Sequence, residues 1–173
     1  SIGLSDTSNL CGSLEFSENI SKAGTQPIIG TQINFTYENT TGLLPLIALN
    51  RSGYKKILEL SSKSYLHNST ISDPQLNISE LLENSTDIIV FSGSISGLFG
   101  KLFDKGKFED IKKLYKKLST ILGDRFYLEI QRHGDKNEIE FEKYNLKIST
   151  ELEIPIIATN EVFYIHKDMY DAH

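Results

Sequence analysis

The part of the sequence best placed to do chemistry is an apolar run that leads into two polar residues. Ile154 to Ala158 is short and rich in β-branched residues, which is typical of a strand covered on both faces. Pro155 stands at its start, where a missing N–H disturbs a ladder least. Asn160 and Glu161 follow where the strand should end, and parallel α/β folds place their ligands at that end. We therefore expect the site there.

Other residues with metal-binding or nucleophilic chemistry are few and scattered. His67, His166 and His173 have no partner at the spacing of metal ligands, so we interpret them as surface side chains. Cys11 is the sole cysteine, and it can form neither an internal disulfide nor a thiolate metal cluster. The sequence also lacks a G-x-S-x-G elbow, a G-K-[ST] phosphate loop and zinc-ribbon spacing.

The bulk composition is that of a soluble globular domain. The 173 residues suffice for one domain with a core, and we expect no second domain. No apolar run approaches the ~20 residues needed to span a bilayer. The formal net charge of −5 argues against a domain that is itself a general nucleic-acid clamp. The chain opens at Ser1 as if within a strand and stops abruptly at His173, so we expect a fragment of a longer protein.

Predicted strands and helices alternate along most of the chain, which favours a parallel sheet covered by helices. Asp6 to Asn9 is expected to form a turn and helix cap, Tyr37 to Gly42 a polar loop, and residues 67–77 a linker. The predicted strands are Ile2–Ser5, Pro27–Phe35, Leu43–Leu49, Asp87–Phe91, Arg125–Gln131 and Ile154–Ala158. The predicted helices end near Lys22 and Tyr65, span Ile78–Glu83, 97–105 and 107–122, and include a last long helix that ends near Leu152.

Apolar spacing predicts which helix faces are buried. In the first helix these are Leu10, Leu14, Phe16 and Ile20; in the second, Tyr54, Ile57, Leu58, Ser61 and Tyr65. In the helix 107–122 they are Phe108, Ile111, Leu114, Tyr115, Leu118 and Ile121, and in the last helix Phe141, Tyr144, Ile148 and Leu152. The helix 107–122 carries Lys112, Lys113, Lys116 and Lys117 on its outer face. Such a row could touch a nucleic-acid backbone, although a solvated helix face is the more common explanation.

Four stretches resemble one family. The end of the chain, "IPIIATNEVFYIHKDMYDAH", is similar to the A-T-N-D-x-H-Y ending of PHP domains in bacterial DNA polymerase III alpha subunits. "DTSNLCGSLEFSENISKAGTQPIIGTQ" resembles T-D-H-x-N-L-x-G-x-x-x-F followed by K-x-A-G-I-K-P-I-I-G-x-E. "LIALNRSGYKKILELSSKSYL" and "RFYLEIQRHG" resemble two further motifs of that family.

This resemblance implies a fold and a cellular role. The fold would be an α/β, PHP-type distorted (β/α) barrel with seven repeats, partial over residues 1–173 because the first βα unit would lie upstream of Ser1. The protein would be a cytoplasmic DNA-directed DNA polymerase, a nucleotidyltransferase of DNA replication. Its catalytic Mg²⁺ would belong to a palm domain downstream. The expected partners are the remaining domains of the subunit and a proofreading exonuclease subunit, with DNA contacted only through the holoenzyme and no contact with a membrane.

The resemblance also implies that the family's metal centre has degenerated here. Asp6 and His133 keep the family residue. At the other positions Thr7, Leu43 and Phe163 replace histidines, Gln32 replaces a glutamate, Ser94 a cysteine, and Glu161 an aspartate. We expect a vestigial pocket without catalytic residues, metal or cofactor, in which Phe163 packs against Leu43 as a hydrophobic plug.

Three functions remain open at this stage. The first is a metal-free scaffold within the polymerase that docks the exonuclease subunit. The second is a stand-alone, metal-dependent phosphoesterase of the PHP superfamily, such as a histidinol phosphatase, although such an enzyme should keep its ligands. The third is a small-molecule binder on the same barrel.

Overall fold

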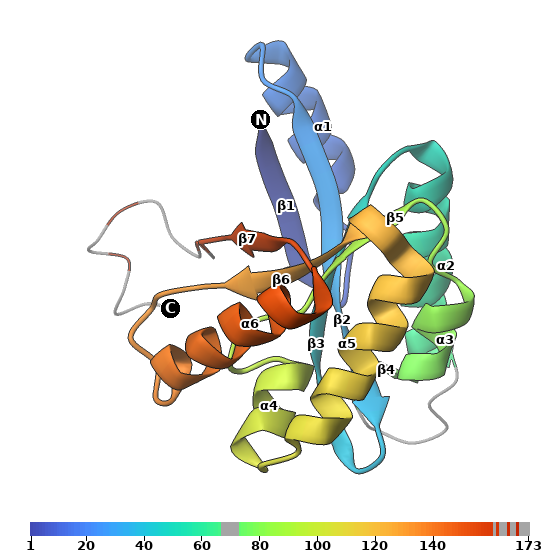
Figure 1. Ribbon diagram of the computed structural model, residues 1–173. Coiled ribbons are helices and arrows are strands. Elements are labelled where there is room, and N and C mark those ends of the chain that lie inside the picture. The colour runs from blue at the N-terminus through green and yellow to red at the C-terminus, as the bar shows by residue number, and fades with distance from the viewer. Residues whose placement is uncertain (67–72, 161, 163–165, 167–168, 170–173) are drawn as a thin grey trace.

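A single curled, mixed sheet forms the frame of the molecule (Figure 1). The computed structural model describes residues 1–66, 73–160, 162, 166 and 169. The strands are β1 (Ile2–Thr7), β2 (Pro27–Tyr37), β3 (Thr40–Ala48), β4 (Gln75–Asn77), β5 (Ile88–Phe91), β6 (Phe126–Ile130) and β7 (Ile156–Ala158). The helices are α1 (Ser13–Lys22), α2 (Arg51–Leu66), α3 (Ile78–Glu83), α4 (Leu98–Asp104), α5 (Phe108–Leu122), the 3₁₀ turn η1 (Gly123–Arg125) and α6 (Glu138–Leu152).

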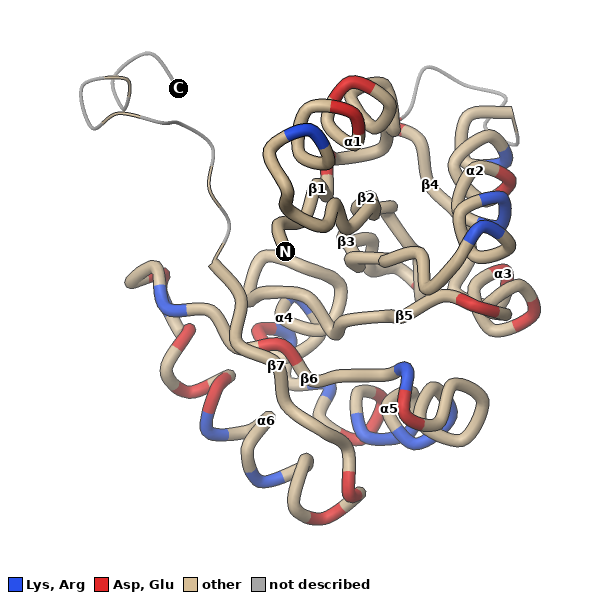
Figure 2. Tube along the Cα trace, turned by 90° about the horizontal axis from the view of Figure 1, so that it is seen from above, with Lys and Arg blue, Asp and Glu red and all other residues tan. Residues whose placement is uncertain are grey.

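The strand order is β1-β2-β3-β5-β6-β7, and β4 pairs separately with β2. Helices α1, α2, α5 and α6 lie around the outside of the curved sheet (Figure 2). The predicted α/β class is therefore confirmed, and the sheet has the form of a half-barrel, as expected of an incomplete (β/α) barrel.

The sheet is mixed, which corrects the prediction of a purely parallel one. β3 runs antiparallel to both β2 and β5, whereas β1–β2, β2–β4, β5–β6 and β6–β7 are parallel. The cause is the segment predicted as a polar loop. Its ends belong to the β2–β3 ladder, where Tyr37 pairs with Thr40, and Glu38 takes a positive φ of 49° in the tight turn. The hydroxyls of Thr36 and Thr41 lie 2.9 Å apart across the hairpin.

Two further predictions about strands were wrong. Gln75–Asn77, expected within a linker, forms β4 and pairs with Asn34–Thr36 of β2. β7 was expected to be covered on both faces, yet Ile156 and Ala158 are exposed. β7 pairs only with β6 and ends the described sheet, so it lacks the second neighbour that a covered strand would have.

In several helices the buried face differs from the face that apolar spacing predicted. The buried residues of α2 are Gly53, Ile57, Leu60 and Ser64, whereas Leu58 and Tyr65 are exposed. Gly53 faces inward because α2 approaches the backbone of Asp87 too closely for a side chain there. Leu14, Phe108 and Ile121 were likewise expected inside, and they are 71%, 45% and 41% exposed.

The centre of the core lies between α4, α5 and the sheet. Tyr115 is fully buried, with its ring 4.5 Å from that of Phe99 and 5.7 Å from that of Phe126. Its hydroxyl donates to Oδ1 of Asn145 on α6 at 3.1 Å, so one phenol ties two helices together. Leu44 and Leu46 of β3 and Ile33 and Phe35 of β2 complete the fully buried layer.

The buried phenol of Tyr115 and the partly buried phenol of Tyr144 should make the stability of the fold decrease at high pH. Burial raises the pKa of Tyr115 well above its ordinary value near 10, and burial together with the carboxylates of Glu109 and Glu151 raises the pKa of Tyr144 to about 12. Above pH ~10 the unfolded chain loses these protons first, so the free energy of unfolding should decrease by about 1.4 kcal/mol per pH unit for Tyr115. Denaturant titrations between about pH 8 and 11 would measure this slope.

A Tyr115→Phe variant provides the check on this prediction. The free energy of unfolding of this variant should no longer show the alkaline slope that Tyr115 causes. It should also be lower by about 1–2 kcal/mol at every pH, because Asn145 loses its hydrogen-bond donor. An unchanged slope in the variant would show that Tyr115 does not set the alkaline limit.

Candidate functional site

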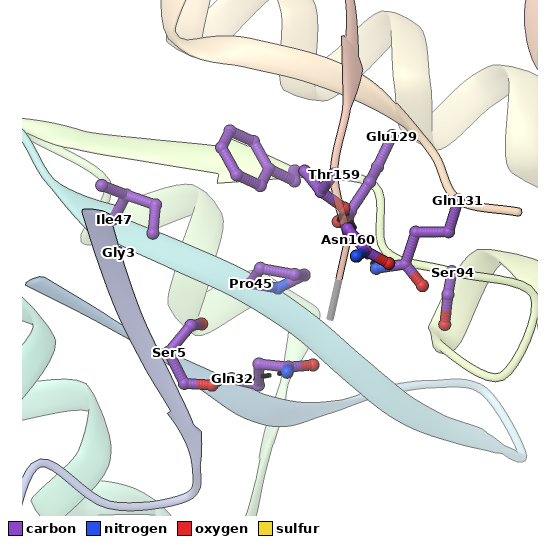
Figure 3. Close-up of a pocket in the computed structure, with 11 residues that line it drawn as sticks. Gly3, Ser5, Gln32, Pro45, Ile47, Ser94, Glu129, Gln131, Thr159 and Asn160 are labelled. Atoms are coloured by element: carbon purple, nitrogen blue, oxygen red, sulfur yellow. Dashed lines mark hydrogen bonds between the residues drawn. The ribbon is translucent and has the colours of Figure 1, made fainter. Parts of the chain in front are cut away.

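The concave side of the half-barrel holds a cavity of about 290 Å³ near the carboxyl ends of the parallel strands (Figure 3). Alternation along β1 directs Gly3 and Ser5 into it, and the rest comes from β2, β3, β5 and β6 and from the segments that follow β5, β6 and β7. Its lining consists of Gly3, Ser5, Gln32, Pro45, Ile47, Phe91, Ser94, Glu129, Gln131, Thr159 and Asn160. The predicted position of the site, at the end of the last strand, therefore coincides with this cavity through Asn160.

Among the described residues of this lining, Glu129 is the one that carries a charge, and it belongs to a hydrogen-bonded group with Gln131 and Thr159. Its side chain is nearly buried, at 4% exposure. Oε1 accepts from Nε2 of Gln131 at 3.1 Å and from the hydroxyl of Thr159, and Gln131 also donates to Thr159 Oγ1 at 3.1 Å. The Glu129 backbone N–H donates to Oγ of Ser92 at 2.9 Å. The carboxylate is thus held in place by neutral donors from two strand ends.

Sequence reasoning missed Glu129 and Gln131 as site residues, although a signal was present. Glu129 lies near the end of β6 and Gln131 directly follows its last residue, and at this spacing of two their side chains point to the same side, where they are hydrogen-bonded to each other. A polar pair at that spacing at the end of an otherwise apolar strand indicates a face turned toward a polar cavity.

A second cavity of about 190 Å³ brings together four of the predicted pocket residues. Thr7, Gln32, Leu43 and Ser94 line it, with Gly93, Ser96 and Gly97. Gln32 and Ser94 also line the larger cavity, so the two are neighbours. Gln32 reaches the carbonyl of Ser5 through Nε2 at 3.4 Å, and the hydroxyls of Ser94 and Ser96 lie 2.8 Å apart.

Asp6 and His133, the two family residues that the sequence retains, lie outside both cavities. Asp6 is on the face of β1 opposite Ser5 and Thr7, with its Oδ2 3.6 Å from where a Cβ on Gly12 would be, beside the start of α1. It is thus a neighbour of α1 and lines neither cavity. The alternation of side chains along a strand makes this separation unavoidable once Thr7 faces inward.

His133 is exposed and lines none of the cavities described here. Its loop is fixed by Glu138, a buried carboxylate at the start of α6 that accepts the backbone N–H groups of His133 at 2.9 Å and of Gly134 at 2.8 Å. Glu161 and Phe163 lie outside the described residues, so the plug of Phe163 against Leu43 stays a prediction.

The chemistry of the second cavity does not fit a transition-metal centre. Such ions prefer imidazole, thiolate and carboxylate ligands, whereas Thr7, Gln32, Leu43 and Ser94 offer hydroxyls, a neutral amide and hydrocarbon. Within residues 1–66, 73–160 and the three single residues described, no three His, Cys, Asp or Glu side chains are grouped closely enough to hold a metal.

In the same part of the chain, no helix has the length and apolar character to cross a membrane.

Comparison with known proteins places this geometry in a family. The PHP domain model matches residues 1–133. DNA polymerase III alpha subunits match 99% of the chain, at 38% identity in Rickettsia bellii, 34% in Caulobacter vibrioides and 32% in Vibrio cholerae. The chain spans about 15% of the length of these relatives, covering 15% of the first and 16% of the second.

A solved structure supports the same fold. The crystal structure of a protein from Bifidobacterium adolescentis, assigned as a metal-dependent phosphoesterase, superimposes with a TM-score of 0.56 at 11% identity. The match covers 91% of this chain and 75% of the other. At that identity the likeness concerns the fold alone. The match of the PHP domain model to residues 1–133 shows that the chain belongs to the PHP domain family.

Proposed function

We propose that this chain is a metal-free structural module of a DNA polymerase III alpha subunit. The whole protein would be a cytoplasmic DNA-directed DNA polymerase acting in replication, with its Mg²⁺ in a separate palm domain. The module would brace the remaining domains of the subunit and dock a proofreading exonuclease subunit. Its kinship with alpha subunits over 99% of the chain supports the replication role.

The observation that carries the scaffold role is the neutral lining at the strand ends. Thr7, Gln32, Leu43 and Ser94 occupy one cavity, and none of them can serve as a strong ligand or a general base. Metal-assisted phosphoester hydrolysis needs cations to activate water and to bind the phosphate oxygens. In the larger cavity, the carboxylate of Glu129 accepts hydrogen bonds from the neutral amide of Gln131 and the neutral hydroxyl of Thr159.

The first test is catalytic turnover. We expect the full-length subunit to extend a primer, and this chain by itself to release neither phosphate nor nucleotides in the presence of Mn²⁺, Zn²⁺ or Mg²⁺. Phosphate release from a chromogenic monoester and nucleotide release from a labelled oligonucleotide are the measurements.

A His133→Ala variant makes the outcome decisive. Metal-dependent release that disappears in this variant would overturn the scaffold role and establish the alternative, a PHP-superfamily phosphoesterase. Activity that is indifferent to this variant would not come from a centre at His133, and a Glu129→Gln variant, which removes the carboxylate from the larger cavity, would then distinguish a site in this chain from a contaminating enzyme.

A further inference from the structure

The outer face of α5 carries a concentrated positive charge on an acidic protein. Lys113, Lys116 and Lys117 are exposed, and Lys112 is partly exposed beside them; we call these four residues the α5 lysine face. No acidic residue occurs between Ile111 and Gly123, so the face has one sign along most of the helix (Figure 2). The chain as a whole has a formal charge of −5.

Most of the other lysines in the described part of the chain are neutralised or hydrogen-bonded locally. Lys63 pairs with Glu80 at 3.1 Å, Lys143 pairs with Glu140 at 2.7 Å, and Lys107 pairs with Glu38. Lys101 and Lys105 donate to Thr41 O at 2.9 Å and Thr40 Oγ1 at 2.8 Å, respectively. The charges of Lys63, Lys107 and Lys143 are therefore compensated within the chain, and the ammonium groups of Lys101 and Lys105 are held by neutral acceptors of the β2–β3 hairpin.

The α5 lysine face differs from that pattern. Lys112 pairs with Glu151 of α6, whereas Lys113, Lys116 and Lys117 make no ion pair with any described residue. Lys113 and Lys117 are four positions apart on one helix, a spacing at which like charges repel. The face thus carries positive charge that no ion pair compensates, and the repulsion between Lys113 and Lys117 slightly destabilises the helix.

The opposite side of α5 makes this face rigid. Ile111, Leu114, Tyr115, Leu118 and Leu122 are buried against the core. Because these residues fix the rotation of the helix, the three lysines keep their mutual spacing when a partner arrives. From Lys112 to Lys117 the helix rises about 7.5 Å, and successive phosphates on one DNA strand rise about 3.4 Å, so the face covers two or three phosphates.

The chemistry of the face favours nucleic acid over an acidic peptide. Lysine is depleted in protein–protein interfaces, where aromatic residues and arginine dominate. It is a common phosphate binder as a flexible point charge.

We propose that the α5 lysine face binds the phosphate backbone of the primer–template duplex. This inference rests on the proposed function, because it assumes that the chain is part of a DNA polymerase. The contacts would be independent of base sequence and would add to those made by the rest of the subunit.

The experiment uses the full-length subunit that contains this chain. A Lys113→Gln/Lys116→Gln/Lys117→Gln variant is compared with the unmodified subunit in fluorescence-anisotropy titrations of a labelled primer–template from about 50 to about 400 mM salt. The matched control is Lys55→Gln/Lys136→Gln/Lys147→Gln. These three exposed lysines make no ion pair with a described residue and are spread over α2, the β6–α6 loop and α6.

Each phosphate contact contributes about −0.9 to the slope of log K against log salt concentration, so the α5 variant should bind with a slope less negative by about 2 to 3. Its affinity at low salt should fall by roughly tenfold or more. The control should keep the slope of the unmodified subunit. Both variants should show an unchanged thermal transition, since all six side chains lie on the surface.

The inference would be overturned if the α5 variant and the unmodified subunit bound DNA with equal salt slopes. It would also be overturned if the control variant changed the slope as much as the α5 variant, because net charge alone would then explain the effect. Loss of exonuclease binding with DNA binding intact would assign the face to an acidic protein partner and would also overturn it. An unmodified subunit that neither binds nor extends primer–template would instead refute the proposed function.

Discussion

Replacing Gly53 with alanine should destabilise the fold by about 3 kcal/mol or more, although alanine normally stabilises a helix by 0.5–1 kcal/mol over glycine. A Cβ on Gly53 would lie 1.9 Å from the carbonyl oxygen of Asp87 and 2.8 Å from its carbonyl carbon. Both contacts are with backbone, so no side-chain rotation can relieve them. Helix α2 would have to move away from the segment that leads into β5. Denaturant titration of the variant measures the effect.

A Gly3→Ala substitution is the matched control. The nearest atom to a Cβ there is the carbonyl oxygen of Ile28 at 4.0 Å, which is an ordinary contact, and the residue is exposed in β1. We expect a change within about 0.5 kcal/mol for this variant. A Gly53→Ala protein as stable as the Gly3→Ala protein would show that α2 can shift freely and that its close approach is unimportant.

Truncation of Phe99 to alanine should cost about 3–5 kcal/mol, because the ring is fully buried and its removal leaves a cavity beside Tyr115. For a chain of this size, each kilocalorie lowers the melting temperature by about 2–4 °C, so the shift should exceed about 6 °C. Calorimetry or circular dichroism on heating would measure it.

Phe108→Ala removes the same atoms at a site that is 45% exposed. The Phe108 ring contacts those of Phe103 and Tyr144 at centroid distances of 5.3 and 5.7 Å, at the margin of the core. We expect a loss of about 1–1.5 kcal/mol, well below that for Phe99. Equal losses would mean that Phe108 faces the core after all, as periodicity alone predicted.

Periodicity located the helices well and their inner faces less well. The helices 78–83, 97–105 and 107–122 were predicted within a residue or so of α3, α4 and α5. The rotation of α2 could not be predicted, because Tyr54, Leu58 and Tyr65 outweigh Gly53 and Ser64 on any hydrophobic scale. The inward face of α2 is set by where backbones meet, and a glycine signals such a contact only once the neighbouring strand is in place.

The hairpin between β2 and β3 shows why strand direction was missed. The alternation of predicted strands and helices favoured a parallel sheet, although the six residues of the predicted loop 37–42 are too few for the crossover between parallel neighbours. The Tyr37–Thr40 pair and the positive φ of Glu38 make the connection a tight turn, so β3 must run back along β2. A short connection leaves no room for the crossover that a parallel neighbour requires.

At the site, the sequence indicated the chemistry of the smaller cavity but not that of the larger one, where Glu129 and Gln131 were missed. The residue types Thr7, Gln32, Leu43 and Ser94 already indicated a neutral pocket, and the resemblance placed them at strand ends. The tertiary structure places the two retained family residues, Asp6 and His133, outside both cavities. Because side chains alternate along a strand, Thr7 faces inward and Asp6 faces α1, while pairing of β6 with β7 brings Glu129, Gln131 and Thr159 together from positions about 30 residues apart. Composition specifies which groups exist, but only the register of the sheet determines which of them meet.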